Sequence, residues 1–234
     1  RLVSFLRDEE PEQTRHDLEA LAEGNGTYRF ERVFTQPSGN AIWLGGTAAL
    51  VEQGATQTRI LLVQIDDVTA RKDAERELRH HAAHDPLTGL PNRRLLQHRF
   101  TKVLEQTRTT GRPGALLFCD LNHFKLVNDS YGHEAGDHAL REIATRLTSA
   151  VRHGDTVARL GGDEFAVLAE DIVGDDLTTL ITRLEDAVSR PLPNIAIHVT
   201  TSVGTVPITP RTTDLDALLH QADQAMYAAK KHRN

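Results

Sequence analysis

The chain has 234 residues, of which 39% are hydrophobic and 26% are charged, and its formal net charge is -6 at pH 7. This composition is typical of a folded globular protein with room for one large domain or two small ones. The acidic balance argues against a nucleic-acid partner, which favours basic surfaces, and no run approaches the roughly 18 apolar residues that cross a bilayer. We therefore expect no nucleic-acid binding and no membrane contact within this part of the chain.

The first zone, residues 1–69, predicts a short helix followed by a sheet. Residues 12–23 have a helical pattern that ends at the turn signal Gly24-Asn25-Gly26. Three β-rich runs follow at residues 28–34, 41–51 and 59–65, and a segment with Pro and Gly separates the first run from the second. An antiparallel sheet is the expected arrangement.

Residues 70–84 predict a linker helix, because they are rich in Arg, Glu and Ala and contain neither Gly nor Pro. Ala74, Leu78 and Ala82 would form a thin apolar stripe, so we expect this helix to pack against a partner helix. Two alternatives exist for the histidines at 80, 81 and 84, a metal site or a solvated helix, and the surrounding Arg and Glu residues favour the solvated helix.

In the third zone, residues 85–234, helices and strands alternate. Helices are predicted at 95–107, 134–151 and 176–189, and a last helix follows a capping box formed by Thr213 and Asp216. Strands are predicted at 115–119, 157–160, 165–168 and 195–206. The zone is therefore expected to be an α+β fold in which helices flank a mainly antiparallel sheet.

Three carboxylates of this zone are candidates for a metal site. Asp120 follows the apolar run 115–119, and Asp163 and Glu164 lie at the tip of a predicted hairpin. If the two strands are neighbours, the carboxylates converge and repel one another unless a cation neutralises them, and oxygen ligands suit Mg²⁺ or Mn²⁺. The alternative is an ordinary turn with solvated acids, because Gly and Asp both favour turns.

Seven motifs in this zone together indicate a family. They are, in order, Asp85-Pro-Leu-Thr-Gly-Leu-Pro-Asn-Arg93, Asp120-Leu-Asn-His-Phe-Lys125, Asn128-Asp129, Gly132-His133, Gly136-Asp137, Arg159-Leu-Gly-Gly-Asp-Glu-Phe165 and Ala222-Asp-Gln-Ala-Met-Tyr-x-Ala-Lys230. In this order and spacing they resemble the GGDEF domain of diguanylate cyclases, which make cyclic di-GMP from two GTP molecules. The resemblance implies a palm-like fold, similar to that of adenylyl cyclases.

The resemblance also implies a metal centre. Asp120, the carbonyl of Leu121, Asp163 and Glu164 would hold Mg²⁺ or Mn²⁺. Asp163 and Glu164 would be the catalytic residues, with Asp163 the candidate base for the attacking 3′-hydroxyl. Whether a side chain or the metal removes that proton stays open.

The same resemblance assigns residues to the substrate. The backbone amides of His123 and Phe124 would hold phosphates, and Lys125 and Lys230 would supply positive charge to the triphosphate. The guanine would be read by Asn128 and Asp137, since a carboxylate accepts hydrogen bonds from N1–H and the 2-amino group together. His133 belongs to the matching segment but is expected to act as a hydrogen-bonding spacer. The set is His123, Phe124, Lys125, Asn128, His133, Asp137 and Lys230.

Two positions depart from the family's pattern. Position 122 is Asn where the family often has Asp, and the tail is one residue shorter than usual, so we assign no phosphate contact to Arg233. The motif that begins at Asp85 is expected to be structural, with Pro86 and Gly89 in turns and Asn92 as a helix cap.

Arg152 and Asp155 stand at the position of the family's inhibitory site, where the product cyclic di-GMP binds. Arginine suits such a ligand because it binds phosphate and guanine edges and stacks on bases. Arg183 is a candidate second contact. The alternative is a surface ion pair of little energetic consequence.

Residues 1–69 resemble the C-terminal part of a PAS sensor domain. The similarity rests on Glu31-Arg-Val-Phe, Gly39-Asn-Ala-Ile-Trp43 and Asp67-Val-Thr69. A PAS ligand stays unknown, and Trp43 is expected in the core. Flavin–cysteine photochemistry is not expected, because the one cysteine, Cys119, lies in the cyclase-like zone.

These features predict a regulated enzyme in three parts, a PAS-like sheet (1–69), a signalling linker helix (70–84) and a cyclase domain (85–234). Each domain would bind one GTP, so the chemistry implies a homodimer with the linker helix as its seam. One thiol fits a reducing compartment, and we expect a cytoplasmic location. The chain starts without Met, and we expect it to be a piece of a longer protein, to which a membrane anchor or a phosphodiesterase domain could belong.

The same motifs allow two alternative functions. One is a catalytically inactive GGDEF module that binds GTP or cyclic di-GMP as a regulator, and the other is a nucleotidyl cyclase with a different substrate. The presence of Asp120, Asp163 and Glu164 favours an active enzyme. The guanine-reading pair, Asn128 and Asp137, argues against ATP as the substrate.

Overall fold

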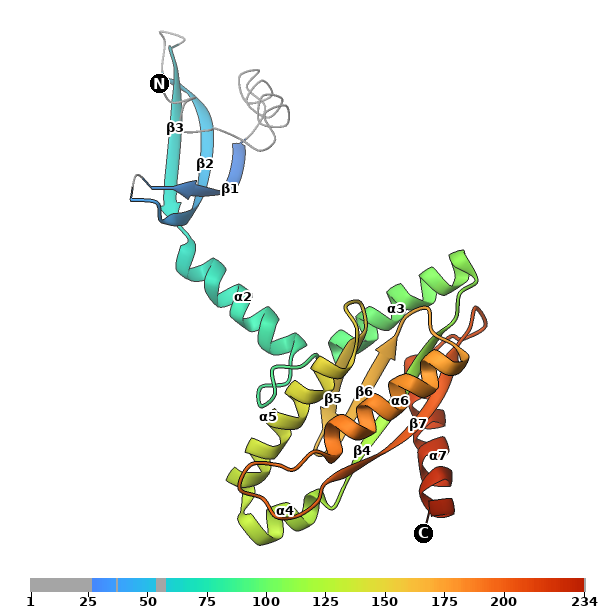
Figure 1. Ribbon diagram of the computed structural model, residues 1–234. Coiled ribbons are helices and arrows are strands. Elements are labelled where there is room, and N and C mark those ends of the chain that lie inside the picture. The colour runs from blue at the N-terminus through green and yellow to red at the C-terminus, as the bar shows by residue number, and fades with distance from the viewer. Residues whose placement is uncertain (1–26, 37, 54–57, 234) are drawn as a thin grey trace. The chain divides into compact units, whose positions relative to one another are not determined.

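The computed structural model describes residues 27–36, 38–53 and 58–233 (Figure 1). The chain divides between Leu78 and Arg79 into two compact units. The helix expected at residues 12–23 lies outside the described residues. None of the described helices is long and apolar enough to cross a membrane.

The first unit contains a three-stranded antiparallel sheet in the order β1-β2-β3, as the sequence predicts. Its strands are β1 (Thr27–Thr35), β2 (Ala41–Gln53) and β3 (Thr58–Asp67). Phe30 of β1 faces Gly46 of β2, and a Cβ at Gly46 would lie 2.3 Å from the Phe30 ring. Glycine is therefore the residue that lets this ring cross its neighbouring strand.

The linker helix α2 (Thr69–Ala83) begins directly after β3 and is fastened to β2. The Trp43 amide donates to the Thr69 hydroxyl over 2.8 Å, and the Val68 amide donates to the Trp43 carbonyl over 2.8 Å. Lys72 and Arg76 each place their cation 5.3 Å from the centre of the Trp43 ring. Trp43 is half-buried, so the expectation of a core tryptophan is corrected to a cation–π anchor for α2.

Helix α2 ends at Ala83, and His84 instead pairs with Pro91 in an isolated β-bridge. His84 therefore lies outside the helix. Across the described ranges, no group of three or more His, Cys, Asp or Glu side chains is close enough to hold a metal ion. Leu78, in the predicted stripe, is 69% exposed within the single chain.

The second unit is an α+β domain built on a four-stranded antiparallel sheet in the order β5-β6-β4-β7. The strands are β4 (Gly114–Asn122), β5 (Thr156–Gly161), β6 (Glu164–Ala169) and β7 (Thr200–Ile208). The helices are α3 (Arg93–Thr110), α4 (Phe124–Tyr131), α5 (His133–Ala150), α6 (Gly174–Ser189) and α7 (Leu215–Arg233). The predicted antiparallel sheet flanked by helices is thus confirmed.

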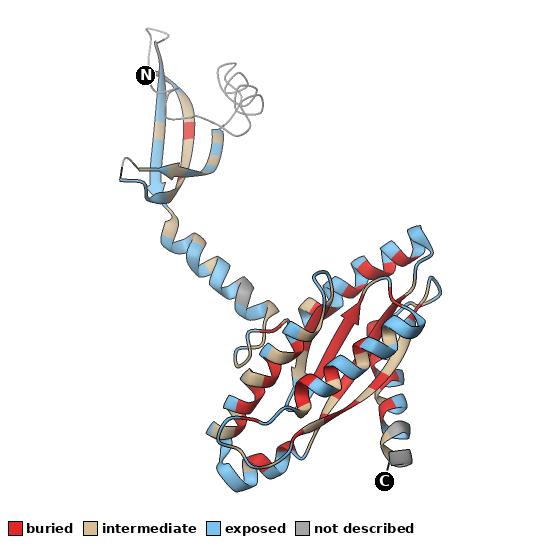
Figure 2. Ribbon diagram, viewed as in Figure 1, coloured by how far each residue is buried: buried red, intermediate tan, exposed pale blue. Residues whose placement is uncertain are grey.

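The apolar residues of β4 pack into two hydrophobic cores, one on each face of the sheet. Leu117 and Cys119 pack with residues of α5 and α6, whereas Leu116 and Phe118 pack with residues of α3 and α7. Side chains alternate along a strand, so a strand covered on both faces needs a continuous apolar run. Figure 2 shows the central strands as buried, which confirms the predicted burial on both faces.

Three details differ from the sequence prediction. Strand β4 runs on to Asn122, so Asp120 lies within the strand rather than after its end. Strand β7 starts only at Thr200, although the β-rich pattern begins at residue 195. The short helix α4 has no strong sequence signal and is held by the buried side chains of Phe124 and Val127.

The helix caps confirm one prediction and contradict another. Asn92 caps α3, because its side chain accepts the amides of Arg94 and Leu95. The capping box expected at Thr213 is wrong, since α7 begins at Leu215 and the Asp214 carboxylate accepts the Ala217 amide over 3.0 Å. An aspartate at the N-cap satisfies the first-turn amide that the box would have served.

Candidate active site

A cavity of ≈ 720 Å³ lies where β4 and β7 meet the start of α4. It brings together seven of the predicted site residues, namely Asp120, Leu121, His123, Phe124, Lys125, Asp163 and Lys230. Its wall also contains polar residues that were not predicted to belong to the site, namely Asn122, Glu185, Asp186, Ser189, Thr200, Thr201 and Ser202. The strand pattern of β7 and the helical pattern of α6 gave no sign that these polar residues face a shared cavity.

The hairpin between β5 and β6 is joined to β4 at the acids. Asp120 pairs directly with Glu164 across the β4–β6 ladder, and the Leu121 amide donates to the Asp163 carbonyl over 3.3 Å. The turn uses Gly161 and Gly162, both with positive φ, a conformation that glycine adopts at little cost. The expectation that these two strands are neighbours is confirmed.

The acids around the hairpin create an excess of negative charge. Burial, followed by the charges of Asp120, Asp163 and Asp223, raises the pKa of the Glu164 carboxyl above its usual value. Lys230 partly offsets this charge, because its Nζ lies 2.9 Å from an Asp120 carboxylate oxygen. A carboxyl with a raised pKa beside like charges is an environment that a bound cation would relieve.

The donors at this end of the sheet are oxygen atoms, which suits Mg²⁺ or Mn²⁺. Among the described residues no three acidic or histidine side chains are close enough to complete a metal site on their own. Mg²⁺ is usually held by one or two carboxylates together with substrate phosphates and water. Asp120, the Leu121 carbonyl and Asp163 are available in the one cavity.

A partly buried arginine, Arg159, binds the turn of the hairpin. Arg159 donates through Nε and Nη2 to the Gly162 carbonyl over 3.0 and 2.8 Å, and through Nη1 to Asp85 over 2.8 Å. Burial raises the pKa of the Asp85 carboxyl, but hydrogen bonds from Thr88 and Arg159 outweigh it, so the pKa is lowered. The structural role expected for the first motif therefore includes positioning the hairpin, which sequence spacing did not reveal.

The N-terminus of α4 opens into the cavity. His123 has a φ of 66° and provides no side-chain cap, while its carbonyl accepts the amides of Leu126 and Val127. Helix N-termini with a left-handed residue direct their first amides outward and so attract anions. Lys125 lies on the same turn and lines the cavity.

Asn128 and Asp137 lie on α4 and α5, outside the lining of this cavity. The Asn128 Oδ1 is 1.9 Å from the point where a Cβ of Gly136 would stand. Gly136 therefore lets the Asn128 side chain reach α5 beside Asp137. His133 is the exposed first residue of α5.

Arg152 and Asp155 form a fixed turn beside the end of β6. The Asp155 side chain is only 2% exposed and accepts the amides of Arg152 and Glu170. The Arg152 guanidinium is 52% exposed, and it contacts Asp155 at 3.4 Å and the carbonyls of Glu170 and Asp171. The motif is thus more than a loose surface pair, because Asp155 shapes the backbone that holds the arginine.

Arg183 of α6 donates to the carbonyl of Ala150, the last residue of α5. It therefore reaches the end of α5, close in sequence to Arg152.

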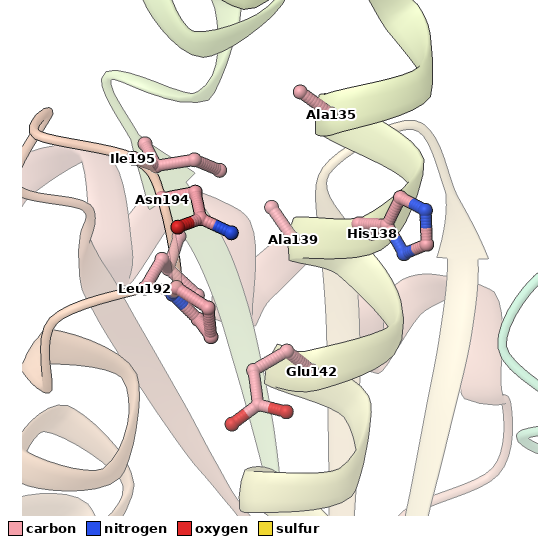
Figure 3. Close-up of a pocket in the computed structure, with 8 residues that line it drawn as sticks. Ala135, His138, Ala139, Glu142, Leu192, Asn194 and Ile195 are labelled. Atoms are coloured by element: carbon pink, nitrogen blue, oxygen red, sulfur yellow. The ribbon is translucent and has the colours of Figure 1, made fainter.

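A second cavity, of ≈ 340 Å³, lies between α5 and residues 192–195 (Figure 3). Ala135, Ala139 and Leu192 form its apolar wall, with Glu142 and Asn194 at its side. It contains none of the predicted site residues.

The family model described as "Diguanylate cyclase, GGDEF domain" matches residues 82–234. The chain belongs to the GGDEF family. The match includes the hairpin, the large cavity and the Arg152 turn, and it leaves the first sheet outside the GGDEF region.

Two curated relatives and one solved structure illustrate the similarity. The chain is 42% identical over 164 residues to the bifunctional diguanylate cyclase/cyclic di-GMP phosphodiesterase MucR of Pseudomonas aeruginosa, covering 69% of this chain and 24% of MucR. It is 36% identical over 220 residues to the diguanylate cyclase TpbB of the same species, covering 92% of this chain and 49% of TpbB. It matches the crystal structure of the P. aeruginosa diguanylate cyclase SiaD, in complex with its activator SiaC, at 33% identity and a TM-score of 0.62, covering 70% of this chain and 64% of SiaD. The chain thus spans half or less of these curated relatives.

Proposed function

We propose that this GGDEF protein is a diguanylate cyclase that condenses two GTP molecules into cyclic di-GMP and releases two pyrophosphates. The observation that carries the proposal is one cavity in which Asp120 and Asp163 meet the open amides at the start of α4. Family membership and the names of MucR and TpbB support the same activity.

Asp120, the Leu121 carbonyl, Asp163 and Glu164 would hold Mg²⁺ or Mn²⁺. When bound, the ion would neutralise charge on the phosphoryl group under attack. The raised pKa of Glu164 supports this assignment, because desolvation and then the charges of Asp120 and Asp163 disfavour its charged form, which a cation would relieve. Asp163, at the turn held by Arg159, is the proposed base for the 3′-hydroxyl of the attacking GTP.

The remaining residues of the site would bind and orient GTP. The amides of His123 and Phe124, with Lys125 and Lys230, would hold the triphosphate, since phosphoryl transfer depends mainly on positioning and charge. Asn128 and Asp137 would read guanine, and the packing of the Asn128 side chain on Gly136, the residue before Asp137, supports a joint role. His133 would be a spacer beside them.

Each active site would be completed by a second copy of the chain, because each GTP attacks the α-phosphate of the other. We propose the division 1–69, 70–84 and 85–234, with a PAS-like sensor acting through the linker helix. The anchoring of α2 on Trp43 supports transmission from sheet to helix. Product inhibition at Arg152 and Asp155 is proposed from the half-exposed guanidinium and its fixed turn.

The deciding experiment is incubation of the protein with Mg²⁺ and GTP at high protein concentration, followed by chromatography of the nucleotides. We expect cyclic di-GMP and two equivalents of pyrophosphate, and loss of both in Asp163→Ala. Tight GTP binding without product would indicate instead a regulatory GGDEF module. Full turnover by Asp163→Ala would refute the assigned site.

A further inference from the structure

One wall of the active-site cavity is formed by three polar side chains that bond to each other. Asn122 of β4 faces Thr200 of β7 in the ladder, and Ser202 faces Asp120. The Asn122 amide nitrogen donates to the Thr200 hydroxyl over 3.1 Å and to the Ser202 hydroxyl over 3.0 Å. The Ser202 hydroxyl also lies 3.2 Å from the Asn122 amide oxygen, to which it donates.

The direction of these hydrogen bonds fixes the role of the Thr200 hydroxyl. A threonine hydroxyl carries one hydrogen and two lone pairs. Because Thr200 accepts from Asn122, its hydrogen is directed elsewhere, and within the described part of the chain it has no protein acceptor. Thr200 lines the same cavity as Lys125 and Lys230, so its unused donor is in the cavity that would receive phosphate.

We propose that Asn122 is a positioning residue that presents the Thr200 hydroxyl as a hydrogen-bond donor to a phosphate oxygen of the bound nucleoside triphosphate. This inference rests on the proposed function, since it concerns the same site. It adds Thr200 to the groups that bind the triphosphate and gives Asn122 a role through Thr200.

The side-chain chemistry at position 122 decides the polarity of this wall. An amide can donate to Thr200, whereas a carboxylate has only acceptors. With a carboxylate at 122, Thr200 would donate to it and turn its lone pairs toward the phosphates. It would also add negative charge to a cavity that already contains Asp120, Asp163 and Asp186, which would oppose an anionic ligand.

A double-mutant cycle tests this coupling. Thr200→Val removes the hydroxyl with little change of shape. Asn122→Asp reverses the direction of the hydrogen bond between position 122 and the Thr200 hydroxyl. The double variant carries both substitutions. The probes are Mg²⁺ with pyrophosphate and Mg²⁺ with a non-hydrolysable GTP analogue, measured by calorimetry. We expect Thr200→Val to weaken both by about tenfold, as for loss of a hydrogen bond to a charged group.

In the wild-type background, Asn122→Asp should weaken binding of both probes more than Thr200→Val does. The loss of affinity that Asn122→Asp causes should be smaller in the Thr200→Val background than in the wild-type background. Additive effects in the cycle would overturn the inference, because independent residues do not couple. The KM for GTP should rise with a smaller change in kcat, whereas a purely structural role would lower the denaturation midpoint and leave the affinity of the folded protein unchanged.

Thr205→Val, on the same strand but outside the cavity lining, is the matched control and should bind both probes as wild type does. Wild-type affinity in Thr200→Val would also refute the inference while leaving the proposed cyclase activity intact. A wild-type protein that binds no GTP would instead refute the proposed function itself.

Discussion

Glu164 and Asp85 are two carboxylates of the hairpin region whose pKa values move in opposite directions. Asp85 is stabilised in its charged form by Thr88 and Arg159, whereas Glu164, at the exposed start of β6, is destabilised in its charged form by partial desolvation and neighbouring acids. The difference separates a structural carboxylate from one that is suited to meet a cation. Each carboxylate therefore has its own dependence of stability on pH.

The raised pKa of Glu164 predicts a pH-dependent gain in Glu164→Gln. Above the ordinary pKa of 4.5, the charged Glu164 carboxylate destabilises the folded state relative to the unfolded state. Well below that pH, Glu164 is protonated in both the folded and the unfolded state, so the effect disappears. In metal-free buffer we expect Gln to raise the thermal midpoint slightly at pH 7, by about one degree, and not at all near pH 4. Calorimetry over that range measures the effect.

Mg²⁺ should raise the wild-type midpoint more than that of Glu164→Gln, because the variant lacks the carboxylate that is proposed to bind the metal. A gain that persists unchanged at acidic pH would contradict the electrostatic explanation.

The lowered pKa of Asp85 predicts the opposite sign. The Asp85–Arg159 pair stabilises the fold above the ordinary pKa of 3.8, and this contribution is lost as the pH falls through the lowered value. Asp85→Asn should cost about 2 kcal/mol of unfolding free energy at pH 7, with cyclase activity reduced because Gly162 is held less firmly.

Urea denaturation at pH 7 and in strong acid, well below that lowered pKa, would show the difference between variant and wild type shrinking in acid. Arg94→Gln, at an exposed neighbour on α3, is the control. Equal activity of Asp85→Asn and wild type would remove the positioning role.

At the scale of elements, the apolar continuity of β4 predicts a strand buried on both faces, and the two cores confirm it. The two-glycine turn likewise predicts the β5–β6 hairpin. Helix α4 could not be predicted from the sequence, because a helix of eight residues has little intrinsic stability. Its formation depends on the burial of Phe124 and Val127 in the tertiary structure. The candidate site likewise contains residues that the motifs predict and pairs that only the tertiary structure brings together.

Residues within motifs could be selected from the sequence, and seven of them share the cavity. The pairing of Asp85 with Arg159, and of Asn122 with Thr200, could not be selected. In each case the partners lie far apart in the sequence and meet only through strand register or a partly buried ion pair. Propensity and spacing carry no information about such long-range geometry.

The turn that holds Arg152 leads to a prediction about inhibition by the product, cyclic di-GMP. Arg152→Ala should leave initial rates intact and remove inhibition by accumulated cyclic di-GMP, because the half-exposed guanidinium is lost while Asp155 still binds the Glu170 amide. The loss of hydrogen bonds to two carbonyls should cost about 1 kcal/mol of stability. Progress curves with added product are the measurement.

Arg141→Ala, an exposed arginine of α5, is the matched control and should keep the inhibition. Unchanged inhibition in Arg152→Ala would exclude this turn as the product site.

At the scale of the whole molecule, α2 begins on the first sheet, and the boundary between the two units falls within it. If two copies meet along α2, the exposed Leu78 is the apolar contact that would be lost to a charge. Leu78→Glu should therefore move the rise of specific activity to a protein concentration about tenfold higher, equivalent to about 1.4 kcal/mol of association.

Sedimentation and activity would be followed over the same concentration range. Glu77→Gln, at an exposed neighbour, should behave as wild type. Specific activity that is independent of protein concentration for both proteins would argue against assembly through α2.

Cys119 offers a use for the burial of β4. Its side chain is fully buried, and burial, with the charge of Glu185, raises the pKa of the thiol to about 12. A thiol reagent can therefore react only when the sheet opens, so the alkylation rate reports opening of the strand that carries Asp120. Any ligand that binds the folded site should slow this labelling in proportion to its occupancy. The alkylation rate of Cys119 therefore measures nucleotide binding, even in a chain that cannot turn the nucleotide over.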